Sequence, residues 1–159
     1  MTRLLSITLI LLFTSTALAD HGRWRRRQPQ PHQPQLDLER LRQLTRACQD
    51  AMEGPTNEQA CLDIVSRSRR PQIEQVIRAC EDAMEGDPNE LACIRTMTST
   101  NLALAAVRAC EDAMEGDPNE LACMSSLVGT RYEPAALVRY CEETATGDAA
   151  ELACIARWR

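Results

Sequence analysis

Residues 78–93 read RACEDAMEGDPNELAC, and residues 108–123 repeat the same sixteen letters. Two degenerate copies flank them: residues 46–61 (RACQDAMEGPTNEQAC) share twelve letters with this motif, and residues 139–154 (RYCEETATGDAAELAC) share nine. The copies recur about every 31 residues. A period of this length is the sequence signature of a repeat architecture. We therefore place four tandem units at residues 36–70, 71–100, 101–131 and 132–159.

Each unit is predicted to fold as two helices joined by a tight turn. Apolar side chains recur at helical spacing in the first half of the second unit, at Val76, Ile77, Cys80, Ala83 and Met84. Pro71 and Pro134 are expected to start the first helices of units two and four. Strand-like alternation of useful length is absent from the sequence. The predicted fold class is all-α: four tandem helix-turn-helix repeats.

The turn inside each unit carries the start and stop signals of helices. Gly86 is predicted to end the first helix in a left-handed conformation. Asp87 is the predicted N-cap of the second helix, with Pro88 at its first position and Glu90 at its third. The buried face of that second helix is predicted to hold Leu91, Ile94 and Thr98.

The eight cysteines occupy mirror positions in these hairpins. Cys80 lies six residues before Gly86, and Cys93 lies six after Asp87, so the two face each other across an antiparallel hairpin. One disulfide is therefore predicted in each unit. Zinc bound by thiolates is the competing interpretation, but it expects close pairs such as CxxC, which the sequence lacks. The predicted bridges are Cys48–Cys61, Cys80–Cys93, Cys110–Cys123 and Cys141–Cys154.

The first 19 residues have the features of a secretion signal. Arg3 precedes an apolar run of ten residues, 4–13, which is short for a membrane span. Ala17-Leu18-Ala19 matches a small-x-small cleavage site, so cleavage is predicted after Ala19; an uncleaved anchor is the alternative. Export to the periplasm or outside the cell would provide the oxidising compartment that disulfides need.

Residues 20–35 (DHGRWRRRQPQPHQPQ) are predicted to form a disordered tail. The segment has a net charge of +3, whereas residues 36–159 have 13 arginines against 22 acids, a net charge of −9. It is interpreted as a spacer, as an anchor to an anionic surface, or as a copper site at the new N-terminus and His21. The anchor would use Arg23, Trp24, Arg25, Arg26 and Arg27.

The layout of residues 36–159 resembles the tetratricopeptide and Sel1-like class of α-solenoid. The resemblance implies stacked helical hairpins and supplies no site residue. The period is nearer 31 than 34 residues, and the Trp-Leu-Gly-Tyr pattern of that class is missing. Coiled-coil-helix proteins are also similar in having twin-cysteine hairpins, but they carry Cx9C within each helix, whereas this chain has Cx12C across the turn.

Acidic side chains gather at the hairpin tips. The candidate binding residues are Glu85, Asp87, Glu90, Glu115, Asp117 and Glu120. They are interpreted as a solvated rim or as a surface for a basic partner, a cation or the tail. Arginine precedes an acid by four positions in every unit, at Arg46, Arg78, Arg108 and Arg139, which predicts exposed ion pairs.

The three aromatic residues of the folded region lie in its last unit. Tyr132, Tyr140 and Trp158 are predicted to cover the open C-terminal end of the stack. Alternatively, Trp158 frays into water and serves a partner.

Catalytic chemistry has little support in this sequence. Residues 36–159 contain neither histidine nor lysine, so a Ser-His-Asp or Cys-His arrangement needs the tail. No catalytic residue, metal site, cofactor or nucleic-acid interface is predicted. The leading hypothesis is an exported, non-enzymatic repeat protein that binds a protein partner. The alternatives are a structural envelope protein anchored by its tail, and a thiol-redox or other enzyme.

Overall fold

The protein is described by a computed structural model that covers residues 34–159, with side-chain environments from residue 38 onward. The predicted signal peptide, the predicted cleavage site after Ala19 and the tail arginines with Trp24 lie outside the described residues. Eight helices and no strand occur within residues 34–159. They are α1 (Pro34–Ala51), α2 (Pro55–Val65), α3 (Ile73–Ala83), α4 (Asp87–Ser99), α5 (Leu104–Ala113), α6 (Asp117–Leu127), α7 (Pro134–Thr144) and α8 (Asp148–Arg157).

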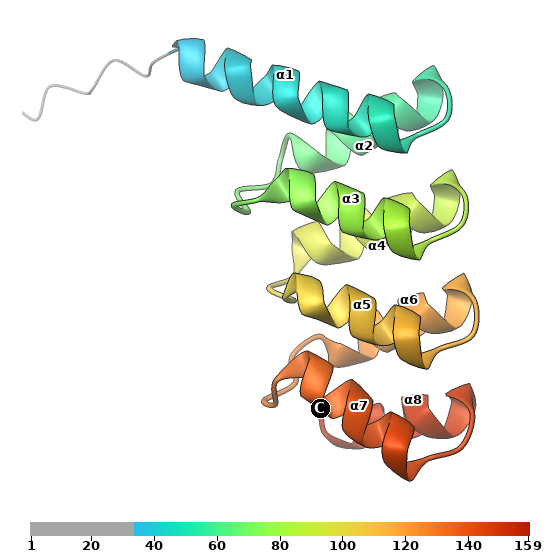
Figure 1. Cartoon of the computed structure of the whole chain (residues 1–159). Helices are drawn as coiled ribbons and strands as arrows, with labels where there is room; N and C mark the ends of the chain where they lie inside the picture. The colour runs from blue at the N-terminus through green and yellow to red at the C-terminus, as the bar shows by residue number, and fades with distance from the viewer. Residues whose placement is uncertain (1–33) are drawn as a thin grey trace, which may run out of the picture. The chain divides into compact units, whose positions relative to one another are not determined.

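The helices form four antiparallel hairpins stacked in chain order, which confirms the predicted all-α repeat fold. The odd-numbered helices form one row and the even-numbered helices a second row behind it (Figure 1). The hairpin turns all lie along one edge of the stack, and the linkers between units lie along the opposite edge (Figure 1). Equivalent residues of the units therefore recur in columns along the stack.

One disulfide connects the two helices of each hairpin, as predicted from the mirror placement of the cysteines. The Cα atoms of each pair are 5.6–5.7 Å apart, and no cysteine of the described residues is free. Each bridge closes a short loop, which contributes about 3 kcal/mol in the chain-entropy model. The four bridges are Cys48–Cys61, Cys80–Cys93, Cys110–Cys123 and Cys141–Cys154.

The core is a continuous layer of aliphatic side chains and cystines between the two rows of helices. All five predicted core residues in the first half of unit two are buried: Val76, Ile77, Cys80, Ala83 and Met84. The face of α4 differs in part from the prediction, because Leu91 and Thr98 are only half-buried. Ile94 is buried as predicted, and the other buried residues of α4 are Glu90, Cys93 and Met97.

One predicted helix start is wrong by two residues. The first helix of unit two begins at Ile73 rather than Pro71, because Gln72 takes a left-handed conformation with φ 60°. Residues 34 and 35, assigned to the tail, already belong to α1. Pro134 does start α7, where the Glu133 side chain accepts hydrogen bonds from the backbone of the first turn.

The turn glycine has a different role from the predicted one. Helix α3 ends at Ala83, and Met84 is extended, so Gly86 does not end this helix. Gly86 is the N-cap of α4, with φ 83° and ψ 142°, a conformation that favours glycine. Asp87 is therefore the first helical residue and makes no capping bond to its own helix. Its carboxylate instead accepts hydrogen bonds from the preceding hairpin.

Within residues 34–159, no helix has both the length and the apolar composition needed to cross a membrane. The four disulfides are compatible with an extracellular or periplasmic location, where such bonds persist.

Candidate functional site

The acidic hairpin tips connect neighbouring units. Asp87, at the start of α4, accepts a hydrogen bond from the backbone N–H of Glu53 in unit one at 3.0 Å. The side-chain amide of Asn57 donates to the same carboxylate and also to the carbonyl of Glu53, at 3.0 Å. The Asp87 carboxylate therefore accepts hydrogen bonds from a backbone N–H and a side-chain amide in the turn region of the preceding hairpin.

The same contacts recur at the next two interfaces. Asp117 accepts from the Glu85 N–H at 3.0 Å and from the Asn89 side chain. Asp148 accepts from the Glu115 N–H at 3.3 Å and from the Asn119 side chain. We call this column of three aspartates and three asparagines the tip ladder; its members are Asp87, Asp117, Asp148, Asn57, Asn89 and Asn119.

In each end unit, the tip-ladder position that would face no neighbouring unit holds a different residue type. Unit one has Pro55 at the aspartate position, where no described hairpin precedes it. Unit four has Ala150 at the asparagine position and Thr146 in place of the turn glutamate. These three differences from the shared sixteen letters therefore agree with the hydrogen-bond pattern.

A second acidic residue is buried at the tips of units two, three and four. Glu90, Glu120 and Glu151 are only 6–7 % exposed, and one carboxyl oxygen of each has no hydrogen-bond partner. Burial, followed by the nearby charge of Asp87, raises the pKa of Glu90 to about 7. Burial and then Asp117 raise the pKa of Glu120 to about 7 in the same way. These carboxyls release protons near neutral pH.

The six acidic candidates therefore separate into three environments. Glu90 and Glu120 are buried, and Asp87 and Asp117 are half-buried in the tip ladder. Only the turn residues Glu85 and Glu115 are exposed. Residues 34–159 contain no group of three or more acids, cysteines or histidines arranged to hold a metal. The tips thus work first as connections between units.

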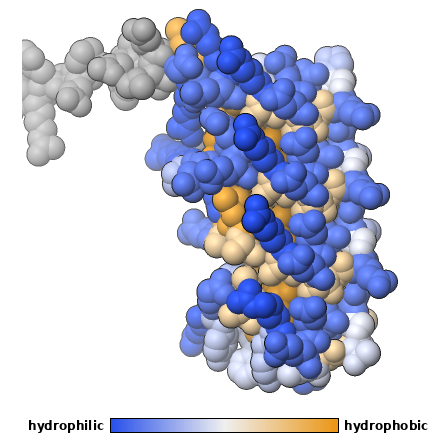
Figure 2. All heavy atoms as spheres, viewed as in Figure 1, coloured by the Kyte–Doolittle hydropathy of each residue, from blue (hydrophilic) through white to orange (hydrophobic). Residues whose placement is uncertain are grey.

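The predicted arginine–acid pairs do not form. In the described part of the chain, the one ion pair within 4 Å joins Arg42 and Glu39, at 3.6 Å. The side chains of Arg46, Arg78, Arg108 and Arg139 are exposed to solvent, where a surface pair contributes little. Figure 2 shows strongly hydrophilic side chains spaced along this face, with apolar surface between them.

Arg70 has a structural role that the sequence did not indicate. It is half-buried on the linker edge and donates to the carbonyls of Met97 at 2.6 Å, Thr100 at 3.2 Å, and Leu102. These carbonyls lie at the end of α4 and in the following linker, where they lack helical partners. Its position in an arginine-rich linker provides no periodic signal.

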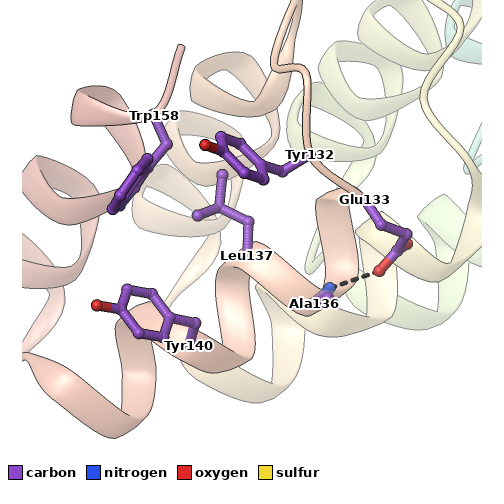
Figure 3. Close-up of a pocket in the computed structure, with 6 residues that line it drawn as sticks. All are labelled: Tyr132, Glu133, Ala136, Leu137, Tyr140 and Trp158. Atoms are coloured by element: carbon purple, nitrogen blue, oxygen red, sulfur yellow. Dashed lines mark hydrogen bonds between the residues drawn. The ribbon is translucent and has the colours of Figure 1, made fainter.

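The aromatic residues of unit four gather at the C-terminal end of the stack, as predicted, but they stay accessible. Tyr132 is 53 % exposed, Tyr140 49 % and Trp158 41 %. Both tyrosine rings pack edge-to-face with the indole, with centroids 5.4 Å and 6.4 Å from it. They partly cover Leu137, which is buried beneath them (Figure 3). The three rings form an incomplete cap with an open concave surface.

Trp158 does not fray from this surface. Its carbonyl accepts a hydrogen bond from the Thr130 hydroxyl at 3.1 Å, and the side chain of Arg159 donates to the Val128 carbonyl at 3.1 Å. Both contacts fix the end of the chain to the linker before α7. The indole is therefore held in place while nearly half of it is exposed.

The rings surround a pocket of about 410 Å³, which we call the aromatic pocket. Its walls come from the two residues before α7, from the first turns of α7 and from the residue after α8 (Figure 3). Its lining is Tyr132, Glu133, Ala136, Leu137, Tyr140 and Trp158. A mostly apolar concavity with one charged group has the general character of a ligand site.

No family model matches this chain, and neither a curated protein nor a solved structure is significantly similar to it. The site must therefore be interpreted from its own geometry.

Proposed function

We propose that this is an exported, non-enzymatic repeat protein that binds a partner through the aromatic pocket of its last unit. The observation that carries the proposal is the distribution of exposed large apolar side chains. Among the described residues they occur only at the two ends of the stack: Leu38 and Leu41 on α1, and Tyr132, Tyr140 and Trp158 in unit four. A persistent exposed apolar surface is typical of an interaction site.

The composition of the pocket supports a binding function over catalysis. Tyrosine and tryptophan supply large contact areas with little conformational freedom to lose, and they are enriched at binding hot spots. The only titratable groups lining the pocket are Glu133 and the two tyrosines. Residues 36–159 have no histidine or lysine for proton transfer or nucleophilic attack.

A pulldown with mature protein, carried out on material from the compartment to which the protein is exported, tests this proposal. Tyr140→Ser removes one wall of the pocket and should abolish capture. Glu142→Gln changes an exposed residue two positions along the same helix, outside the pocket lining, and should preserve capture. Thermal melts of both variants control for folding. Equal capture by the two variants would refute a binding function for this face.

A tail-anchored envelope protein is the second candidate, because residues 20–35 have a net charge of +3 that would attract an anionic surface, whereas residues 36–159 have a net charge of −9. Deletion of residues 20–33 separates the two functions. An anchored protein would lose attachment to anionic vesicles after this deletion, whereas partner capture through the aromatic pocket would persist.

A further inference from the structure

We infer that the aromatic pocket binds a quaternary ammonium group. This inference rests on the proposed function of the pocket as a binding surface and specifies the chemistry of its ligand. The juxtaposition that carries it is three aromatic rings around an apolar floor, with Glu133 at the edge and no basic side chain among the described lining residues (Figure 3).

The orientation of the rings leaves aromatic faces available. The planes of Tyr132 and Tyr140 stand at 81° and 80° to the plane of Trp158. In an edge-to-face pair one ring presents its edge, so its two faces remain free for another contact. Figure 3 shows the indole on one side of the pocket and the two tyrosines above and below Leu137. A cation seated in the pocket would contact a free, negatively polarised ring face.

The charge of the residues that line the pocket favours a cation over an anion. Glu133 is the only charged residue that lines the pocket. Its carboxylate accepts hydrogen bonds from the backbone N–H groups of Ala135 at 3.2 Å and Ala136 at 2.6 Å, at the start of α7. This carboxylate therefore lies at the edge of the pocket, beside the start of α7 (Figure 3).

The apolar floor of the pocket favours a cation that has no N–H groups. Leu137 and Ala136 are apolar, so a primary ammonium that entered the pocket would lose water without finding enough acceptors. A quaternary ammonium has no N–H group to satisfy and presents methyl groups to the floor. Aromatic cages of this kind are the established means of recognising such ions. The volume of about 410 Å³ lies within the usual range of small-ligand pockets, roughly 300–1,000 Å³.

The fluorescence of Trp158 provides a direct readout of binding. In mature protein that carries Trp24→Phe, Trp158 is the single tryptophan of the chain. The probes are tetramethylammonium, choline and 3,3-dimethyl-1-butanol, which is the neutral isostere of choline, at constant chloride and ionic strength. We expect saturable quenching by both cations and at least about tenfold weaker binding of the neutral alcohol.

Variants connect the signal to the proposed contacts. Tyr140→Leu keeps an apolar wall but removes a ring, and Glu133→Gln removes the charge while keeping one of the two oxygens that accept backbone hydrogen bonds. Each should weaken choline binding about three- to tenfold. Glu142→Gln, the matched control, should leave it unchanged. Equal affinity for choline and the alcohol, or no saturable response to either cation, would overturn the inference.

The two proposals fail separately. If partner capture depends on Tyr140 while no ammonium ion binds, the pocket is a protein-binding surface and the ligand chemistry is wrong. If choline binds but capture is insensitive to Tyr140→Ser, the pocket serves a small ligand and the partner proposal is wrong.

Discussion

The carboxylate of Asp87 accepts a hydrogen bond from the backbone N–H of Glu53, which lies 34 residues earlier and one hairpin away. The same relationship connects Asp117 to Glu85 and Asp148 to Glu115. Each hairpin is thus closed by its own disulfide and connected to the next by an aspartate. A small aliphatic core supplies limited stability. These hydrogen bonds and disulfides should therefore contribute much of the free energy of unfolding.

Removal of one ladder aspartate should destabilise the whole stack. Asp117→Ala leaves the Glu85 N–H without its acceptor and removes one of the two acceptors of the Asn89 amide, so the free energy of unfolding should fall by about 1–3 kcal/mol. Denaturant unfolding measures this change. Asp112→Ala, an exposed acid on α5 with no hydrogen-bond partner in the structure, is the matched control and should shift it by less than about 0.5 kcal/mol. Equal effects of both substitutions would contradict the ladder.

Stability should fall as the pH rises toward neutrality. The pKa values of Glu90 and Glu120 are raised from an ordinary 4.5 to about 7, so the folded protein holds protons that the unfolded chain has released. The free energy of unfolding should therefore decrease between about pH 4.5 and 7, by on the order of 1–3 kcal/mol for each carboxyl, and then level off.

A matched pair of variants isolates this effect. Glu90→Gln should flatten the pH dependence and stabilise the protein at pH 8. Glu58→Gln changes the equivalent position of unit one, which no described hairpin covers and which is only half-buried. It should change the slope much less. A slope between pH 5 and 7 that Glu90→Gln leaves intact would show that other groups cause it.

The fourth disulfide should be reduced first. Cys154 is half-buried, whereas each of the other seven cysteines is at most 1 % exposed. Exchange requires a thiolate to reach a sulfur atom, so access sets the order of reduction. Limited reduction followed by alkylation and peptide mapping should label Cys141 and Cys154 before any other pair. Earlier labelling of Cys48 and Cys61 would contradict this order. Full reduction should lower the melting temperature sharply.

Trp158→Ala should cost less stability than truncation of a fully buried aromatic. Because 41 % of the residue is exposed, we expect a loss of about 1–2 kcal/mol, compared with about 3–5 kcal/mol for an enclosed ring. Thermal unfolding of protein lacking residues 20–33 measures this change. A loss above about 3 kcal/mol would show that Trp158 is mainly a cap, and would weaken the case for an open pocket.

The sequence predicted the features that depend on spacing. The mirror positions of Cys80 and Cys93 determined both the hairpin and its bridge, and the 31-residue period determined the number of units. The prediction was wrong about Asp87, because an aspartate before a proline resembles an N-cap whether its carboxylate turns to its own helix or to a neighbour. Local sequence does not distinguish these two partners.

The candidate site was predictable only in outline. The clustering of Tyr132, Tyr140 and Trp158 in the last unit indicated an end surface, but not that the rings would remain about half exposed around a pocket. Ring orientation depends on the fixation of Trp158 by Thr130, a contact 28 residues apart in sequence with no repeated equivalent. Contacts made once in a repeat protein are invisible to an analysis based on periodicity.

Site-specific photocrosslinking tests the proposed binding face most directly. A photoreactive side chain would replace Ala136, an exposed alanine that lines the aromatic pocket. The control replaces Ala105, an exposed alanine on α5 outside that pocket. After export and irradiation, we predict a specific adduct from position 136 that Tyr140→Ser abolishes, and none from position 105. An adduct of equal yield at position 105, or none at position 136 while the protein still captures its partner, would contradict binding through the last unit.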